Sequence, residues 1–349
     1  MGARVTLAQV AERSGYSPTA VSFVLSGREG TRISEKAAKK IRETADEMGY
    51  SPDPRARALR TGKSEAIGFI SNDVIVTRYA SAMVVGAVDR AEQADRVMLI
   101  SESGGSRNQS QAIEALLERR VDGLLVGLMG TRLVEVPDAA LSVPTIVVNG
   151  IAKGFPGIVP DERAAGYEAA RYLIDAGHTR IGLIGRPDLD GDDAGLEILR
   201  RRFEGIDRAM NDAGLSFVAE YGTREWEPAA GLMGAKQVIE NHDVSALLCA
   251  NDRLSFGAYQ AAAQLGLSIP TDLSVMSFDD EQLAGYLTPG LTTMRLPYEE
   301  MGRFGTDWVL RQADAGVPHG KRNGEEFLVP MPLVERGSVA RPGDRSSSF

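Results

Sequence analysis

The sequence predicts a small α-helical head followed by an α/β body of two similar lobes, each built on a doubly wound parallel sheet. Residues 1–63 read as short helices joined by tight turns, whereas the chain from Ser64 onward alternates apolar runs with amphipathic helices. The charge divides in the same way. Residues 1–63 hold 12 Lys and Arg against 7 Asp and Glu, and the remainder holds 27 against 41. A basic head on an acidic body favours a head that binds a polyanion.

The composition is that of a globular protein. The 349 residues include 43% hydrophobic and 25% charged residues, enough to form well-buried cores. The single cysteine, Cys249, excludes an internal disulfide and fits a reducing compartment. The start of the chain has no apolar run typical of a secretion signal, and no segment approaches membrane-spanning length. We therefore expect a cytoplasmic protein without a membrane partner.

Two short helices open the head. Thr6 and Gln9 have the spacing of a capping box, which predicts a helix over residues 7–14. After a glycine turn, Ser17 can cap a second helix and Pro18 suits its first position. This second helix carries small hydroxyls and one aromatic ring on the face opposite its apolar stripe.

A third helix, capped by Ser34 and stopped by Gly49, completes the head. The apolar residues that can form one small core are Leu7, Val10, Ala11, Val21, Val24, Ile41 and Met48. Two short helices joined by a tight turn and braced by a third form the helix-turn-helix plan, in which the second helix lies in the DNA major groove. The alternative is a three-helix cap that binds no ligand.

The head resembles the amino-terminal region of LacI/GalR-family bacterial transcriptional regulators. The resemblance is carried by TLAQVAERSGYSPTAVSFVLSG and by ISEKAAKKIRETADEMGYSPDPRARALRTGKS, which follows it. It implies a helix-turn-helix DNA-binding domain over 1–50 and a hinge over 51–63 that becomes helical on operator DNA and inserts Leu59 into the minor groove. The residues expected to contact DNA are Thr6, Ser17, Pro18, Thr19, Ser22, Phe23, Arg55, Arg57 and Leu59.

Phe23 departs from the family pattern, because many members carry arginine at this position, where it can pair with guanine. A phenylalanine offers only apolar contact, for instance to a thymine methyl group, or it turns back into the core of the head. Pro18 and Thr19 are also unsuited to bidentate readout of bases. The resemblance therefore predicts DNA binding without predicting the operator sequence.

The body contains apolar runs of strand length between helical stretches, as expected for parallel strands buried on both faces. These runs are residues 66–71, 97–103, 123–128, 144–150, 180–185, 246–252 and 273–280. They predict two Rossmann-like lobes with a boundary near Asp161. No G-x-G-x-x-G follows any of the runs, so we expect no dinucleotide cofactor.

Polar residues gather where these strands end, and ligands of such sheets bind outside the carboxyl ends of the strands. We expect the two rims to face each other across a cleft. The rim residues are Asn72, Asp73, Glu102, Asn149, Asp161, Asn251, Asp252, Asp279 and Asp280. With Arg202 from a helix and Trp226 from a loop, they suit a polyhydroxylated ligand. Alternatively, Asp252 and Asp280 cap helices and Trp226 is a packing residue.

The body also resembles LacI/GalR regulators, over segments such as RRRFEGIDRAMNDAGL and ALLCANDRLSFGAYQAAAQLGLSIPTDLSVMSFDD. The resemblance implies a periplasmic-binding-protein-like fold. Arg202, Trp226, Asn251 and Asp279 match positions that contact the sugar in family members, while Asn149 and Asp161 match less closely. With Asp73, these seven residues form the expected effector site. Leu296 replaces a glutamine found in some sugar-responsive relatives, so this side of the pocket is expected to be more apolar.

The expected domain boundaries follow from these segments. They are an effector-binding and dimerisation domain over 64–339, with an N-lobe (64–160 and 292–325) and a C-lobe (161–291 and 326–339), and a disordered tail over 340–349. No catalytic grouping is recognisable, and the three histidines lack the spacing of metal ligands, so we expect neither an enzyme nor a metal site.

The expected function is that of a homodimeric repressor of carbohydrate-utilisation genes that a sugar or sugar derivative releases from operator DNA. Closure of the lobes on the effector would separate the hinge segments and withdraw Leu59 from the groove. One alternative keeps the DNA-binding role with a nucleobase or protein corepressor as effector. A transport-type sugar-binding protein and an α/β enzyme with a helical accessory domain are more remote alternatives.

Overall fold

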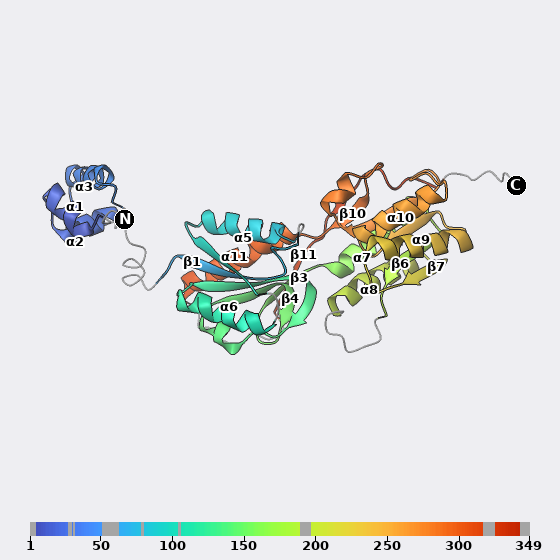
Figure 1. The fold of residues 1–349 in the computed structure, drawn as a ribbon, viewed down its shortest axis with the longest axis horizontal. Helices are drawn as coiled ribbons and strands as arrows, with labels where there is room; N and C mark the ends of the chain where they lie inside the picture. The colour runs from blue at the N-terminus through green and yellow to red at the C-terminus, as the bar shows by residue number, and fades with distance from the viewer. Residues whose placement is uncertain are drawn as a thin grey trace. The chain divides into compact units, whose positions relative to one another are not determined.

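The fold is described from a computed structural model (Figure 1). The structure describes residues 5–26, 30, 32–50, 63–77, 80–103, 106–188, 197–316 and 325–342. The chain forms two compact units, Met1–Glu65 and Ala66–Phe349. We call the first unit the head and the second the body, and describe each separately.

The head consists of three helices, as the sequence predicts. They are α1 (Leu7–Ser14), α2 (Pro18–Leu25) and α3 (Glu35–Glu47). The Thr6 side chain accepts from the backbone N–H of Gln9, and the Gln9 side chain accepts from the backbone N–H of Thr6, which forms the predicted capping box. Gly15 ends α1 at a φ of 77°, a left-handed conformation that suits glycine.

One small core holds the three helices together. Its buried members are Val10, Ala11, Val21, Val24, Ile41 and Ala45, with Leu7 and Met48 among the residues packed against them. The core predicted from the sequence is thus confirmed. Residues 51–62 of the predicted hinge, with Arg55, Arg57 and Leu59, lie outside the described residues.

The first lobe of the body is a six-stranded parallel sheet in the order β11-β5-β4-β3-β1-β2. The strands are β1 (Ala66–Asn72), β2 (Val97–Glu102), β3 (Gly123–Val134), β4 (Thr145–Ala152), β5 (Gly157–Pro160) and β11 (Glu326–Val329). Its helices are α5 (Ala82–Glu92), α6 (Ser106–Glu118), η1 (Asp138–Ser142) and α11 (Tyr298–Ala315).

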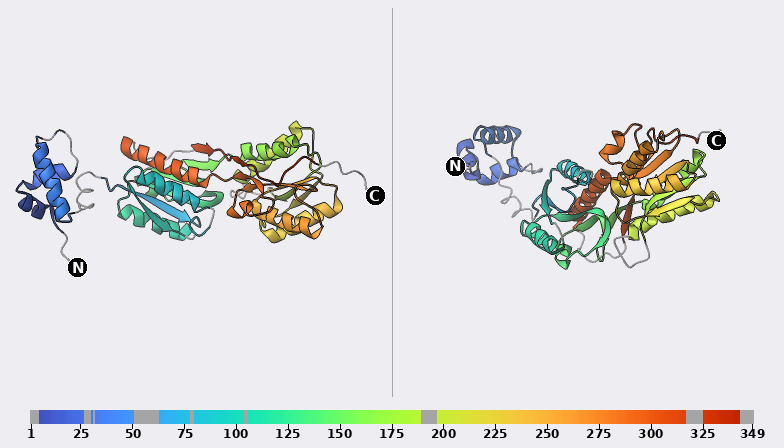
Figure 2. Two further views of the ribbon diagram at one scale, coloured as in Figure 1. Left: turned by 90° about the horizontal axis from the view of Figure 1, so that it is seen from above. Right: turned by 45° about the vertical axis from the view of Figure 1, so that its right-hand side comes forward.

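Helices cover both faces of this sheet, which is why its strands read as continuous apolar runs. Leu125 packs in a core with residues of α5 and α11, whereas its neighbours Leu124 and Val126 pack in a second core with residues of α6. The views in Figure 2 show helices on either side of each sheet. This is the doubly wound arrangement that the sequence predicts.

The second lobe is a six-stranded sheet in the order β12-β10-β9-β8-β6-β7, parallel except for β12. The strands are β6 (Ile181–Arg186), β7 (Ala219–Gly222), β8 (Ala246–Cys249), β9 (Ser274–Asp279), β10 (Thr292–Arg295) and β12 (Leu333–Val334). Its helices are α7 (Glu162–Asp175), α8 (Glu197–Asp212), α9 (Pro228–Asn241), α10 (Asp252–Gln264) and η2 (Gln282–Gly285). Helix α7 packs on α8, and α9 packs on α10.

In the described chain, three segments cross between the lobes, and two of them correct the expected lobe boundaries. They lie at Asp161, at Leu296–Pro297 and at residues 330–332. Residues 292–295, expected in the N-lobe, form β10 of the second sheet, and residues 326–329, expected in the C-lobe, form β11 of the first. Both strands therefore belong to the opposite lobe from the one expected. The sheet that a strand joins is decided by its pairing with other strands, which the local sequence does not reveal.

Side chains also join the lobes. The guanidinium of Arg201 in α8 donates from both Nη atoms to the carboxylate of Glu326 in β11, at 2.7 and 3.1 Å. No helix in the described part of the chain is long and apolar enough to cross a membrane.

Candidate functional site

The exposed face of α2 is the candidate DNA-contacting surface of the head. Val21 and Val24 are buried in the head core, while Pro18 and Thr19 are exposed and Ser22 is half-buried. Phe23 is half-buried and is not one of the buried residues of this core. The helix therefore presents small polar groups and one aromatic ring beside each other, as the sequence predicts.

Two of the expected DNA contacts also have structural roles. The Thr6 hydroxyl accepts from the N–H of Gln9 at 3.4 Å, and the Ser17 hydroxyl accepts from the N–H of Ala20 at 3.2 Å. These bonds begin α1 and α2. A hydroxyl retains further hydrogen-bonding capacity, so capping is compatible with a phosphate contact.

Arg202 of α8 is the centre of the candidate effector site in the second lobe. Arg202 is 3% exposed, and its Nε and Nη2 atoms donate to the two carboxylate oxygens of Glu162 at 2.6 and 2.8 Å. Nη1 donates to the backbone carbonyl of Ala250 at 2.5 Å. Burial lowers the pKa of Arg202, but the pair with Glu162 more than compensates and raises it. The guanidinium is therefore a fixed positive charge.

Aromatic rings flank this guanidinium. Its central carbon lies 4.4 Å from the ring centroid of Phe278 and 5.8 Å from that of Trp226. Trp226 lies in the loop before α9, is half-buried, and donates from Nε1 to the carbonyl of Gly185 at 2.9 Å. The indole is thus held in one orientation beside a cation, which suits stacking on the C–H face of a ring.

Asn251 brings the start of α10 to the same place. Its Oδ1 accepts from the N–H of Leu254 at 2.9 Å, which caps the helix, and its Nδ2 contacts the carbonyl of Trp226 at 3.4 Å. Asn251 therefore joins α10 to the loop that carries the indole.

Asp279 ends β9 at a φ of 109°, outside the region that non-glycine residues favour. It is 8% exposed, and burial raises its pKa well above the usual range, against the opposing charge of Arg202. Asp252, Glu162 and Glu281 raise it further. The structure thus brings together four of the seven expected effector residues, namely Arg202, Trp226, Asn251 and Asp279.

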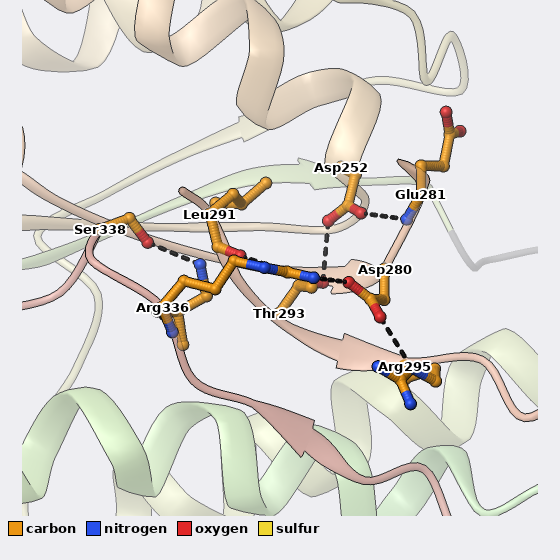
Figure 3. Close-up of polar contacts among 9 residues, drawn as sticks. Asp252, Asp280, Glu281, Leu291, Thr293, Arg295, Arg336 and Ser338 are labelled. Atoms are coloured by element: carbon orange, nitrogen blue, oxygen red, sulfur yellow. Dashed lines mark hydrogen bonds and ion pairs between the residues drawn. The ribbon is translucent and has the colours of Figure 1, made fainter. Parts of the chain in front are cut away.

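Asp252 and Asp280 are neither helix caps nor members of this group (Figure 3). Asp252 is fully buried; its carboxylate accepts from the hydroxyl of Thr293 at 2.8 Å and from the N–H of Glu281 at 2.7 Å. Burial raises its pKa to about 7. Asp280 forms ion pairs with Arg295 and Arg336. The capping alternative is wrong for both, because Asn251 caps α10 and η2 has no side-chain cap.

The expected residues of the first lobe lie at the ends of its central strands or at the crossover. Asp73 follows β1 at a φ of 62°, and its N–H donates to Oε1 of Glu102 at 3.0 Å. Asn149 is 1% exposed and donates to the carbonyl of Leu128 at 2.9 Å, so this amide fastens β4 to β3. Asp161 caps α7 through Ala164 and is half-buried.

Glu162 and Phe278 are the site residues that the sequence reasoning missed. Glu162 occupies the buried face of α7 together with Gly166, Ala169 and Leu173. The signal that could have identified Glu162 is its helical spacing from these small and apolar residues, which places its carboxylate on the buried face. A buried carboxylate needs a cation as its partner. Phe278 reads as an ordinary strand residue, and nothing in its local sequence distinguishes it.

The remaining reactive side chains are in the core. Cys249 is fully buried, and burial raises the pKa of its thiol to about 12. His178 is buried between the hydroxyls of Ser245 and Ser274. No cluster of three metal-ligating side chains occurs among the described residues. The site in the second lobe therefore offers hydrogen bonds, charge and aromatic surface.

Comparisons with known proteins identify the family of the chain. Residues 170–339 match the family described as periplasmic binding protein-like domain. The chain is 31% identical to the ribose operon repressor of Escherichia coli K12, covering 96% of this chain and 99% of the relative. It is also 31% identical to the transcriptional repressor PurR of Proteus mirabilis (96% and 97% covered) and to the regulator MalR of Streptomyces coelicolor (97% and 98%).

Solved structures give the same fold. A lac repressor dimer bound to operator and an anti-inducer aligns with a TM-score of 0.75 at 24% identity, covering 97% of this chain and all of that one. A transcriptional regulator of Rhizobium etli described as LacI family aligns with a TM-score of 0.69 at 29% identity, covering 80% of this chain and all of that one.

Proposed function

The chain belongs to the LacI/GalR family of transcriptional regulators, and we propose that it represses carbohydrate-utilisation genes until a sugar or sugar derivative binds at Arg202, Trp226, Asn251 and Asp279. As a member of this family it is a DNA-binding regulator controlled by a small molecule rather than an enzyme. Its binding partner is chromosomal DNA, so we place its action in the cytoplasm.

The observation that carries the sugar assignment is the state of Asp279. Its carboxylate is buried beside a fixed cation, and none of the hydrogen bonds within the described chain ends on it. The Asp279 oxygens are not among the fully buried side-chain atoms that lack a partner in the described chain, so they are open to a ligand partner. Ligand hydroxyls can supply it, while Trp226 stacks on the sugar ring and Arg202 keeps two N–H groups beyond those bound by Glu162 and Ala250.

The head supplies the DNA-binding part of the proposal. The face of α2 with Pro18, Thr19, Ser22 and Phe23 would read base edges in the major groove. Arg55 and Arg57 would contact phosphates and Leu59 would wedge a minor-groove step, on the resemblance alone. One such head buries too little surface for tight specific binding, so two copies of the chain are needed.

The body offers surfaces for that dimer. In the first lobe, β2 is an edge strand with Val97 and Ile100 exposed, and Val85 is exposed on the adjacent α5. In the second lobe, Leu283 and Tyr286 are exposed in and beside η2. Exposed apolar side chains along an edge strand favour association, and the lac repressor structure to which the body is similar is a dimer.

A nucleobase effector is the second candidate. Leu296, at the crossover between the lobes, packs against the cores of both and is apolar, and the PurR relatives are as similar to the chain as the ribose operon repressor is. The apolar Leu296 side chain and the half-buried indole of Trp226 suit a planar base as well as a sugar ring.

Tryptophan fluorescence distinguishes these candidates. The chain has two tryptophans, and Trp308 is buried in the first lobe, so the variant Trp308→Phe leaves Trp226 as the only reporter. This variant would be titrated with ribose, maltose, cellobiose, adenine and guanine. Saturable change with a sugar, abolished by Asp279→Asn, supports the proposal. Saturation with a base alone supports the second candidate, and no response to any compound contradicts both.

A further inference from the structure

One carboxylate in the second lobe holds two of the segments that cross between the lobes (Figure 3). Asp280 Oδ2 accepts from Nε of Arg295 at 2.7 Å, and Oδ1 accepts from Nη2 of Arg336 at 2.6 Å. The Asp280 side chain is 8% exposed, whereas those of Arg295 and Arg336 are 48% and 24% exposed. We call these three residues the Asp280 clamp.

Both arginines lie where a crossover meets the second lobe. Arg295 is the last residue of β10, and Leu296–Pro297 then leads directly into α11 of the first lobe. Arg336 lies just after β12, the strand that follows the crossover from β11. Arg336 is fixed further, since its Nη1 donates to the carbonyl of Leu291 at 2.7 Å.

The clamp is continuous with the proposed effector site. Asp279, the neighbour of Asp280, accepts through its backbone carbonyl from the N–H of Leu296 at 3.2 Å. Asp279 and Asp280 have φ values of 109° and 56°, so both stand in a region that few non-glycine residues adopt. A ligand that binds the Asp279 side chain therefore contacts the same turn, residues 279–280, that carries the Asp280 clamp.

We infer that Asp280 is a positioning residue that transmits occupancy of the site at Asp279 to the crossovers at Leu296–Pro297 and residues 330–332. The inference rests on the proposed function, because it requires an effector at Asp279. Movement of the turn changes where the two arginines are held, and with them the directions in which the chain leaves for the first lobe. Two discrete arrangements of such packed elements can carry coupling between sites.

The variant Asp280→Asn tests the inference, with Asp307→Asn as the matched control. Asparagine keeps the shape of the side chain and one carbonyl oxygen but removes the charge that binds two arginines. Asp307 in α11 also bridges two arginines, Arg90 at 2.8 Å and Arg311 at 2.7 Å, yet it lies within the first lobe. Both variants therefore lose a carboxylate that pairs with two arginines, at different places in the body.

The primary readout is the coupling ratio, the operator dissociation constant with a saturating sugar divided by that without it. The operator is a duplex selected from a random pool by the wild-type protein, and the sugar is the one that changes the fluorescence of Trp226. We expect Asp280→Asn to lower the ratio by about threefold or more while the sugar dissociation constant of the DNA-free protein changes by less than about twofold. Asp307→Asn should leave both unchanged. An unchanged ratio in Asp280→Asn overturns the inference.

Amide hydrogen exchange gives a second readout that needs no ligand. Loss of the clamp should speed exchange at residues 291–297 and 333–338 in Asp280→Asn but not in Asp307→Asn. Faster exchange throughout the second lobe would mean that Asp280 is a general stabiliser. Unchanged exchange in these two segments would mean that Asp280 does not hold them. If no compound binds, the proposed function fails, but the exchange comparison still shows whether Asp280 holds the two crossing segments. If Asp280→Asn does not fold, Arg295→Gln removes one arm at a half-exposed position and serves both readouts.

Discussion

Arg202 is a charged side chain in a place almost without solvent, and a single carboxylate makes that possible. Removing the partner of a buried charge is far more destabilising than removing an exposed ion pair, because the remaining charge is left without solvation. The bidentate contact with Glu162 thus both stabilises the second lobe and fixes the guanidinium for a ligand.

Replacing Glu162 with glutamine should lower the free energy of unfolding by about 3 kcal/mol, as for other broken buried pairs. Urea denaturation measures this. Glu204→Gln is the control, since Glu204 pairs with Arg163 across the same two helices but both side chains are exposed. The control should change the free energy by less than about 1 kcal/mol. Equal losses in the two variants would contradict the role given to Glu162.

Effector affinity should rise with pH because of Asp279. Its pKa in the free protein is raised by burial, whereas ligand hydroxyls bind the ionised carboxylate and favour it. Binding therefore releases a proton below the raised pKa, and the affinity increases with pH up to that value, by at most about tenfold per pH unit. Titrations of Trp308→Phe between pH 5 and 8 measure this. An affinity that is constant or falls over the range excludes an ionised Asp279 as the acceptor.

Local signals made single residues of the site predictable, and only tertiary contacts revealed the rest. Arg202, Trp226, Asn251 and Asp279 were assigned through their motifs, and the structure gathers them in one lobe. The Asn149 amide donates to the carbonyl of Leu128, a contact between two strands that has no signal in the local sequence. Glu162 was missed because its partner is 40 residues away.

At the scale of elements, prediction succeeded where the determinants are short-range. The hydroxyls of Thr6, Ser17 and Ser34 begin the three helices of the head, since each needs only an amide three residues further on. Strands β5, β7, β10, β11 and β12, each of four residues or fewer, were not recognised. Such short strands have little periodicity, and β10 and β11 also change sheets through pairing that is remote in sequence.

The close approach of α7 and α8 positions the ion pair of the site, and a glycine permits it. A Cβ atom on Gly166 would lie 2.0 Å from the backbone carbonyl oxygen of Arg202, too near for any side chain. Gly166→Ala should therefore separate the helices, destabilise the protein by about 2 kcal/mol and weaken sugar binding. Glu168→Ala, at an exposed position of α7, is the control for both measurements. A Gly166→Ala variant of normal stability would show that the helices are not in this contact.

The hinge is the element for which Leu59→Ala makes the sharpest prediction. Loss of an apolar wedge removes the bend of the duplex but leaves phosphate contacts in place. Operator affinity should fall by roughly tenfold or more, whereas affinity for a duplex of unrelated sequence should hardly change. Arg57→Ala should instead weaken binding to both duplexes. Fluorescence anisotropy at fixed salt provides the comparison, and equal losses on both duplexes in Leu59→Ala would remove the wedge from the account.

For the whole molecule, the distribution of charge separates the two tasks. Residues 1–63 carry a formal charge of +5 and residues 64–349 a charge of −14, so the head is attracted to DNA and the body is repelled by it. Control by a ligand then requires a difference in ligand affinity between the DNA-bound and free states, because equal affinity shifts no equilibrium. The crossovers and the ion pair between Arg201 and Glu326 are among the described connections through which the second lobe can impose that difference on the first.

The most direct test of the account is the operator affinity of the full-length protein with and without a sugar that changes the fluorescence of Trp226. We predict retardation of a specific chromosomal fragment at low salt and an affinity at least about tenfold lower at saturating sugar. The effect of the sugar should disappear in Asp279→Asn while DNA binding persists. The account would be contradicted by failure to bind any chromosomal fragment, or by equal operator affinity with the site empty and occupied.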